Sequence, residues 1–244
     1  MCSRVPGNIG GQAVMAFLDR FDAVIFDLNG TLAVDFDRFG PDQDYATTYR
    51  QLGGRALAPE PLADLVDSLL ARILRRYEDG PTDPFPSLAE FLAELVGSPA
   101  AETERIDALV AEHEMGTIPR ARVQLLEQLR NSHRLGLISD LWASSDCYRR
   151  YLDQLGLTPI FGSIVFSCEL GAVKPGPRLF QTALDELAVA PERAVFVGDH
   201  ETRDILGAAA CGMSTVWIDT EGHGPMAARP DRVVASLEAL PDLI

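Results

Sequence analysis

The sequence has few of the features that mark nucleic-acid-binding or membrane-spanning proteins. Its 21 Lys and Arg residues stand against 36 Asp and Glu residues, for a formal net charge of −15. Nucleic acids and anionic membrane surfaces bind proteins through clustered positive charge. No apolar run reaches the roughly 18 residues that a membrane-spanning helix needs. The composition therefore argues against a nucleic-acid or membrane partner.

Cysteines are also few, and they lie far apart in the chain. None of the four forms a C-x-x-C pair with another, and they are Cys2, Cys147, Cys168 and Cys211. Reduced thiols are expected from this spacing. The first residues hold no continuous apolar segment followed by a cleavage site, so a signal peptide is not expected. We therefore expect a cytoplasmic protein, whose oligomeric state stays open between monomer and homodimer.

Short apolar segments alternate with helical patterns over the second half of the chain. The apolar segments, together with one near the start, are residues 23–26, 135–138, 163–167, 194–198 and 214–218. Alternation with helices of about 10–15 residues is typical of a parallel sheet that helices cover on both faces. The pattern predicts an α/β fold with a doubly wound, Rossmann-like parallel sheet.

A different pattern separates the first apolar segment from the others. Four helical stretches follow one another without a strand, at about residues 42–52, 59–80, 87–97 and 102–115. Ser87 and Glu90 form a capping box at the start of the third. We predict a core domain of residues 21–35 and 117–244, with a four-helix subdomain of residues 36–116 inserted after the first strand. Residues 1–20 are predicted to be a loose arm.

Polar clusters follow the predicted strands or lie in loops near the same edge of the sheet. They are Asp27 to Thr31, Ser139-Asp140, Lys174-Pro175, and Gly198-Asp199 with Asp204. Because parallel strands end at one edge of a sheet, these groups can converge there. Several carboxylates gathered in one crevice need a compensating cation. With no His or Cys in these clusters, a hard ion such as Mg²⁺ fits the oxygen ligands best.

This set of side chains has a chemical interpretation. Asp27 can act as a metal ligand and as a nucleophile, because aspartate attack on a phosphoryl group is a known covalent strategy. Lys174 and the Ser139 hydroxyl supply the positive charge and the hydrogen bond that a transferring phosphoryl group needs.

Four motifs in order resemble those of the haloacid dehalogenase superfamily of Asp-nucleophile hydrolases, over roughly residues 21–244. They are FDLNGTL, GLISD, GAVKPGPRLFQTAL and VGDHETRDILGAAACGM. The inserted helices resemble the helical cap of that family. The resemblance implies a phosphatase-like enzyme in which Asp27, the backbone carbonyl of Asn29, Asp199 and Asp204 hold Mg²⁺. It also implies that Ser139 binds the phosphoryl oxygens and that Lys174 neutralises Asp27 and the phosphate.

Asn29 departs from the pattern of the family, whose phosphatases usually have a second Asp two residues after the nucleophile. An amide does not titrate, and loss of a general acid–base group typically costs about 10²- to 10⁴-fold in rate. Four interpretations stay open: a slow or specialised phosphatase, an engineered substitution, a dehalogenase-type C–halogen hydrolase, or a pseudoenzyme that binds a phosphorylated metabolite. The Asp199 and Asp204 pair favours the phosphatase.

The substrate is predicted only as a small phosphomonoester. Arg38, near the start of the insertion, is a candidate ligand for a second anionic group of the substrate, although an ordinary surface role is the commoner one. Asp140 is a candidate substrate contact that can instead cap the following helix. Glu112, His113 and Glu114 are predicted to lie on the solvated side of a helix, because adjacent residues do not share a helix face.

Overall fold

A computed structural model of the chain describes residues 17–96, 100–222, 224 and 229–243, and its centre is a parallel sheet. The six strands stand in the order β3-β2-β1-β4-β5-β6, and every neighbouring pair is parallel. Their bounds are β1 (Ala23–Phe26), β2 (Arg134–Ser139), β3 (Phe161–Phe166), β4 (Ala194–Gly198), β5 (Ser214–Ile218) and β6 (Arg232–Val234). The strand order reverses between β1 and β4, which is where open α/β sheets bind their ligands. The predicted Rossmann-like fold is confirmed.

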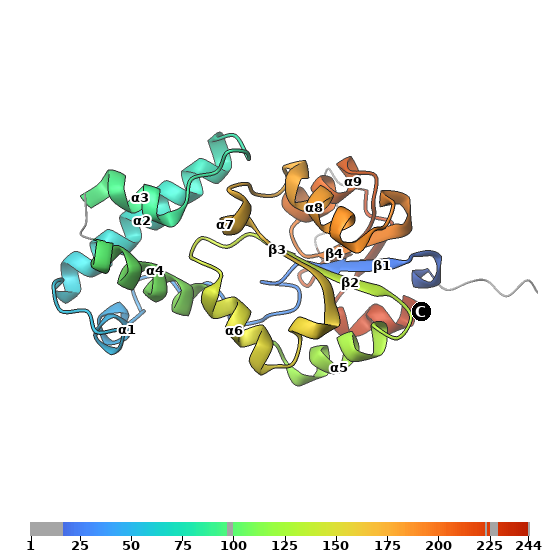
Figure 1. The fold of residues 1–244 in the computed structure, drawn as a ribbon, viewed down its shortest axis with the longest axis horizontal. Coiled ribbons are helices and arrows are strands. Elements are labelled where there is room, and N and C mark those ends of the chain that lie inside the picture. Colours follow the sequence, from blue (N-terminus) through green and yellow to red (C-terminus); the bar gives the residue numbers. More distant parts are fainter. Residues whose placement is uncertain (1–16, 97–99, 223, 225–228, 244) are drawn as a thin grey trace, which may run out of the picture.

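Helices cover both faces of this sheet (Figure 1). One face packs against α5 (Arg120–Leu129), α6 (Asp146–Gln154) and the 3₁₀ segment η5 (Leu237–Leu243). The other packs against α8 (Pro177–Leu187) and α9 (Gly207–Ala210). Side chains of β1 alternate between the two layers, with Val24 and Phe26 in the first and Ala23 and Ile25 in the second. A strand buried on both faces must be apolar throughout, as the run AVIF is.

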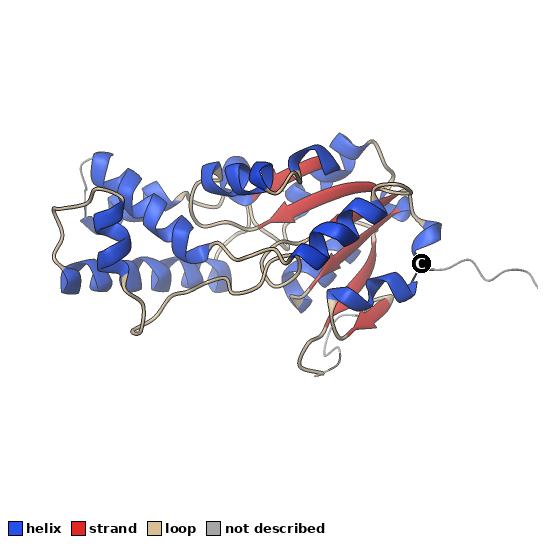
Figure 2. Ribbon diagram, turned by 90° about the horizontal axis from the view of Figure 1, so that it is seen from below, coloured by secondary structure: helices blue, strands red, loops and turns tan. Residues whose placement is uncertain are grey.

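The inserted helices form a second body beyond one end of the sheet, on the side away from the C-terminus (Figures 1 and 2). They are α1 (Tyr45–Gln51), α2 (Pro59–Asp79), α3 (Leu88–Val96) and α4 (Ala100–Glu114). We call them the cap. The cap has its own apolar core, in which α2 contributes Leu62, Val66, Leu69 and Ile73. Tyr45 and Tyr49 of α1 are buried in that core.

Two segments join the cap to the sheet, and they pair with each other. The amide of Val34 donates to the carbonyl of Thr117 at 2.9 Å, and the amide of Thr117 donates back at 2.7 Å. We call this pair the neck. It lies beside the predicted boundaries at 35/36 and 116/117, while the division into two domains itself stays a prediction.

The connection between α2 and α3 makes a further contact between cap and core, far from the neck in sequence. The amide of Phe85 donates to the carbonyl of Gly171 at 2.7 Å, and the amide of Val173 donates to the carbonyl of Thr82 at 2.9 Å. We call these two hydrogen bonds the latch. The latch holds the cap against the loop that carries Lys174.

The predicted loose arm needs correction. Residues 1–16 of the predicted loose arm lie outside the described residues, but 17–20 are ordered: Phe17 and Leu18 are buried, and Leu18–Arg20 is a 3₁₀ turn. Phe17 and Leu18 are buried because they belong to the apolar core on the face of the sheet that α5 and α6 cover. A π-helical turn, η4 (Glu201–Leu206), leads into α9. The remaining short elements are α7 (Ser167–Leu170), η2 (Thr158–Ile160) and η3 (Pro191–Arg193).

No helix within the described part of the chain is both long enough and apolar enough to cross a membrane.

Candidate active site

The predicted site residues converge at the carboxyl ends of three adjacent strands. Asp27 follows β1, Ser139 ends β2, and Asp199 follows β4. Strands β2 and β4 flank β1 on its two sides, so these three residues lie around one point of the sheet edge. All three line one cavity, together with Phe36 and Asp37 and with Glu114 at the end of α4.

Lys174 lies at the centre of this cavity and joins two of the carboxylates. Its ammonium nitrogen is 2.6 Å from Asp27 Oδ1 and 2.6 Å from Asp204 Oδ1, and all three side chains are buried. Burial lowers the pKa of Lys174, but Asp204, Asp27 and Asp140 together raise it above its usual value. The ammonium therefore keeps its charge, which the buried carboxylates require.

One ammonium does not balance the carboxylates that surround it. Asp27, Asp199 and Asp204 each offer an oxygen within 4.8 Å of the others. Burial, together with the neighbouring acids, raises the pKa of Asp27 to about 8 and that of Asp199 to about 6. Asp27 Oδ2 is buried and has no hydrogen-bond partner among the described residues. This set of hard oxygen donors with an unsatisfied buried oxygen fits a divalent cation such as Mg²⁺.

Gly30 allows the turn after β1 to approach Asp199. Its φ is +92°, a region that favours glycine, and a Cβ there would lie 2.2 Å from Asp199 Oδ2. The next residue, Thr31, donates its hydroxyl to Asp199 Oδ1 at 3.4 Å. The turn therefore packs against Asp199 and supplies it with a hydrogen bond.

Asp204 has both of its oxygens engaged. Oδ1 accepts from Lys174, and Oδ2 accepts the amide of His200 at 2.9 Å. Because the helical turn begins at Glu201, with His200 as its N-cap residue, Asp204 lies inside the turn. Within this geometry Asp204 holds Lys174 and the loop after β4 in place.

Asp140 has a role that the sequence left open. Its Oδ1 accepts the backbone amide of Lys174 at 3.1 Å, and its Oδ2 is buried without a partner among the described residues. Helix α6 begins at Asp146 with Ser145 as its N-cap residue, so Asp140 does not cap that helix. Burial raises the pKa of Asp140. Ser139 beside it is buried, and its hydroxyl makes only a long contact of 3.5 Å with the carbonyl of Asp140.

Asn29 lies in the same cavity and faces the end of the cap. Its Nδ2 is 3.5 Å from the backbone carbonyl of Glu114, and its Oδ1 is buried without a partner among the described residues. Asn29 thus lines the same cavity as Asp27, two residues along the chain, but it carries no titratable proton.

Glu114 was missed from the sequence, and the prediction for its neighbourhood is partly wrong. Glu112 is exposed as predicted, but His113 and Glu114 are buried. Glu114 ends α4, and its carboxylate accepts the amides of Trp142 at 2.7 Å and Ala143 at 3.4 Å. The loop after β2 therefore covers the last turn of α4, which a view of the isolated helix cannot show. Burial raises the pKa of Glu114 to about 8, although these amides oppose the shift.

Arg203 also lines the cavity and was not singled out from the sequence, although it directly precedes Asp204. Arg38, the predicted ligand for a second anion, does not line it. The guanidinium of Arg38 donates to the backbone carbonyls of Asp35, Glu112 and Met115 beside the neck. Its role in substrate binding stays a prediction that the geometry does not favour, because these carbonyls already take its donors. The other lining residues that sequence reasoning missed are Phe36, Asp37, Trp142 and His200.

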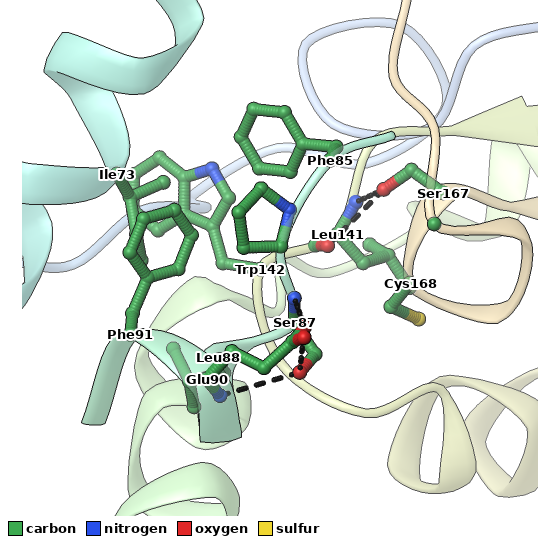
Figure 3. A pocket seen from close by; sticks show the side chains of 12 residues that line it. Ile73, Phe85, Ser87, Leu88, Glu90, Phe91, Leu141, Trp142, Ser167 and Cys168 are labelled. Carbon is green, nitrogen blue, oxygen red and sulfur yellow. Dashed lines mark hydrogen bonds between the residues drawn. The ribbon is translucent and has the colours of Figure 1, made fainter. Parts of the chain in front are cut away.

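A second, apolar pocket lies between cap and core next to this cavity. Figure 3 shows Ile73, Phe85 and Phe91 from the cap facing Leu141 and Trp142 from the core. Trp142 lines both spaces. The capping box of Ser87 and Glu90 lies at the edge of this pocket.

Comparison with known proteins agrees with this architecture. Residues 21–212 match the model of the haloacid dehalogenase-like hydrolases. The chain belongs to this family. Among curated relatives, it is 36% identical to a phosphoserine phosphatase of Thermus thermophilus, over 53% of this chain and 52% of that protein. It is 29% identical to a glyceraldehyde 3-phosphate phosphatase of Methanopyrus kandleri, over 88% of this chain and 91% of that protein.

Solved structures show the same fold at lower identity. A 2-haloacid dehalogenase of Pseudomonas syringae superposes with a TM-score of 0.64 at 24% identity, covering 91% of this chain and 97% of that one. A HAD phosphatase of Thermococcus onnurineus gives a TM-score of 0.61, also at 24% identity and with the same coverage. The prediction of a phosphatase-like hydrolase of this family is confirmed, while the assigned roles of the site residues stay predictions.

Proposed function

We propose that this protein hydrolyses a small phosphomonoester through an aspartyl-phosphate on Asp27, with Mg²⁺ as its cofactor. The observation that carries the proposal is the buried contact of one ammonium with two carboxylates, Lys174 with Asp27 and Asp204 at 2.6 Å each. Asp27, which lines the cavity, keeps its Oδ2 without a hydrogen-bond partner among the described residues. Names of the curated relatives, which include phosphoserine and glyceraldehyde 3-phosphate phosphatases, support a small phosphorylated substrate.

The residues of the cavity would hold the metal ion and stabilise the phosphoryl group. Asp27, Asp199, Asp204 and the backbone carbonyl of Asn29 would hold Mg²⁺, which supplies positive charge to the phosphoryl oxygens. Lys174 orients Asp27 and stabilises negative charge on the phosphoryl group, and the Ser139 hydroxyl donates to it. Asp140 orients Lys174 through its backbone amide.

The cap would protect the reaction from water. Glu114 at the end of α4 and Trp142 on the core line the cavity from opposite sides of the seam, and the amide of Trp142 donates to Glu114. Closure of the cap over bound substrate would exclude bulk water, so that attack by Asp27 waits until the substrate is present.

The test measures phosphate release from p-nitrophenyl phosphate and a panel of phosphorylated metabolites, with Mg²⁺ and with EDTA. Asp27→Asn should abolish release, and EDTA should stop the wild-type protein. Asn29→Asp should raise the rate by about 10²-fold or more on substrates whose alcohol needs a proton to leave. Turnover retained by Asp27→Asn contradicts the nucleophile. No release from any substrate, by either the wild-type protein or Asn29→Asp, contradicts hydrolysis and favours a binding protein or a halide substrate.

A further inference from the structure

Arg203 lies in the catalytic cavity but has no part in the roles given above. It shares the lining of the cavity with Asp27, Asn29 and Lys174. Its guanidinium carbon lies 5.8 Å from the centre of the Tyr77 ring, which belongs to helix α2 of the cap. The head group of Arg203 therefore lies where the core meets the cap.

The carboxylates at the floor of the cavity leave Arg203 without an ion pair. Asp27 and Asp204 pair with Lys174, and the salt bridges among the described residues do not include Arg203. A guanidinium stays protonated at any pH at which the protein is folded. Arg203 thus brings to the cavity a permanent positive charge whose donors are not taken up by a carboxylate of the described residues.

The direction of attack decides which part of the substrate meets this charge. In phosphoryl transfer the attacking and leaving oxygens lie roughly in line on opposite sides of phosphorus. Asp27 attacks from the end of β1, at the edge of the sheet. The leaving oxygen must therefore point away from the sheet and toward the cap, where Arg203 contacts Tyr77.

We propose that Arg203 donates a hydrogen bond to the leaving-group oxygen and stabilises its negative charge, in place of the proton that Asn29 cannot provide. This inference rests on the proposed function. Asp27 Oδ2 forms a bond to phosphorus while the bond from phosphorus to the substrate oxygen breaks, and its electron pair stays on that oxygen as an alkoxide. The alkoxide takes a proton from a single water molecule, and the hydroxide so formed attacks the aspartyl-phosphate. The products are the alcohol and inorganic phosphate, and Asp27 is restored.

The benefit of a hydrogen bond to the leaving-group oxygen depends on the acidity of the leaving group, whereas the benefit of phosphoryl binding does not. A hydrogen bond to a developing oxyanion is worth about 10²- to 10³-fold in rate in a site that excludes water. The help matters most for alkyl esters, whose alkoxides are unstable, and least for aryl esters such as p-nitrophenyl phosphate, whose phenolate leaves without a proton. A residue that only holds the fold or binds the phosphoryl group would affect both kinds of ester equally.

The experiment compares two groups of substrates. The aryl esters are p-nitrophenyl phosphate and a series of aryl phosphates whose phenols are less acidic, and the alkyl esters are glycerol 3-phosphate and 3-phosphoglycerate. The variants are Arg203→Gln and Arg203→Lys. Arg178→Gln is the matched control, because Arg178 also reaches the cap, through an exposed pair with Asp83 at 3.3 Å, but does not line the cavity. Circular dichroism and thermal unfolding show whether each variant is folded.

Arg203→Gln should lower kcat on the alkyl esters by about 10²-fold and on p-nitrophenyl phosphate by less than about tenfold. The slope of log kcat against leaving-group pKa should become steeper, Arg203→Lys should recover part of the loss, and Arg178→Gln should behave as the wild-type protein. In the Asn29→Asp background, which supplies a proton, the effect of Arg203→Gln on alkyl esters should shrink.

Four results would overturn the inference. Equal losses on aryl and alkyl esters indicate a phosphoryl-binding or structural role, and an unchanged kcat on all substrates indicates no role. A rise in KM confined to 3-phosphoglycerate, with glycerol 3-phosphate unaffected, assigns Arg203 to a carboxylate of the substrate. If neither the wild-type protein nor Asn29→Asp releases phosphate from any substrate, the proposed function itself fails, and this is distinct from the first three results.

Discussion

At the scale of single residues, Gly30 shows how closely the turn after β1 fits the carboxylate cluster. A side chain at Gly30 meets Asp199 at 2.2 Å in a backbone conformation with φ of +92°. Gly53 in the cap is the control site: its φ is +81°, but nothing lies within 4 Å of a Cβ placed there. A substitution at Gly53 therefore causes backbone strain without a steric clash. Gly30→Ala and Gly53→Ala should each lose about 1–2 kcal/mol of unfolding free energy from strain.

Gly30→Ala alone should lose more unfolding free energy than this strain accounts for, because its Cβ displaces Asp199. For the same reason, Mg²⁺ should no longer raise the melting temperature of Gly30→Ala as it does that of the wild-type protein. Thermal unfolding with Mg²⁺ and with EDTA measures both effects. A Gly30→Ala protein that Mg²⁺ stabilises as fully as the wild type would contradict the place of Asp199 in the metal site.

Glu114 gives a prediction about pH. Its pKa rises on folding to about 8 because of burial, so folding favours the protonated form. Its contribution to stability is complete below the pKa of the unfolded chain, near 4.5, and is lost as the pH rises through about 8. In EDTA, the unfolding free energy of the wild type relative to Glu114→Gln should fall between pH 5 and 8, by at most about 1.4 kcal/mol per pH unit for one proton. Urea unfolding at several pH values measures this difference, and a flat or rising difference contradicts the buried carboxyl.

The residues of the site were predictable to the extent that each follows a strand. Asp27, Ser139 and Asp199 come directly at or after strand ends, and strand ends of a parallel sheet meet at one edge. Glu114 and Arg203 could not be found in this way. Glu114 enters the cavity because the chain returns through the neck, and Arg203 points to it from a π-helical turn that no periodicity indicates.

At the scale of elements, the first five strands and the cap helices were predicted within a few residues, because apolar side chains recur in them with the period of each element. The ordered residues before β1 were not predicted, because Phe17 and Leu18 are buried only by contacts with the folded sheet and its helices. The start of the third cap helix was placed correctly. Ser87 Oγ accepts the amide of Glu90 at 3.3 Å, and Glu90 Oε2 accepts the amide of Ser87 at 2.8 Å.

Loss of this capping box is expected to affect stability and not catalysis. Ser87→Ala should lower the unfolding free energy by about 1 kcal/mol, because one amide at the start of α3 loses its acceptor. Glu90→Gln keeps an acceptor for the amide of Ser87 and should cost less. Urea unfolding and the rate of phosphate release measure the two effects. A larger loss of unfolding free energy for Glu90→Gln than for Ser87→Ala contradicts the assignment of Ser87 and Glu90 as a capping box.

At the scale of the whole molecule, the latch makes closure of the cap measurable. The amides of Phe85 and Val173 are hydrogen-bonded only while cap and core are in contact. A ligand that binds the closed form, such as orthovanadate with Mg²⁺, should slow hydrogen exchange of both amides together, by about 100-fold at 100 times its Kd. The amide of Asp22, bonded at 2.7 Å to Arg193 within the core, is the control and should not change. Protection of one latch amide without the other would show that cap and core do not separate as two bodies.

The neck has a consequence for how such a protein can change over generations. Val34 and Thr117 lie far apart in the gene, yet two hydrogen bonds hold them side by side. Everything encoded between them leaves the sheet and returns to it at one point. A recombination event that exchanged this coding segment would therefore bring in new walls for the cavity, while Asp27, Lys174, Asp199 and Asp204, all encoded outside it, would stay as they were.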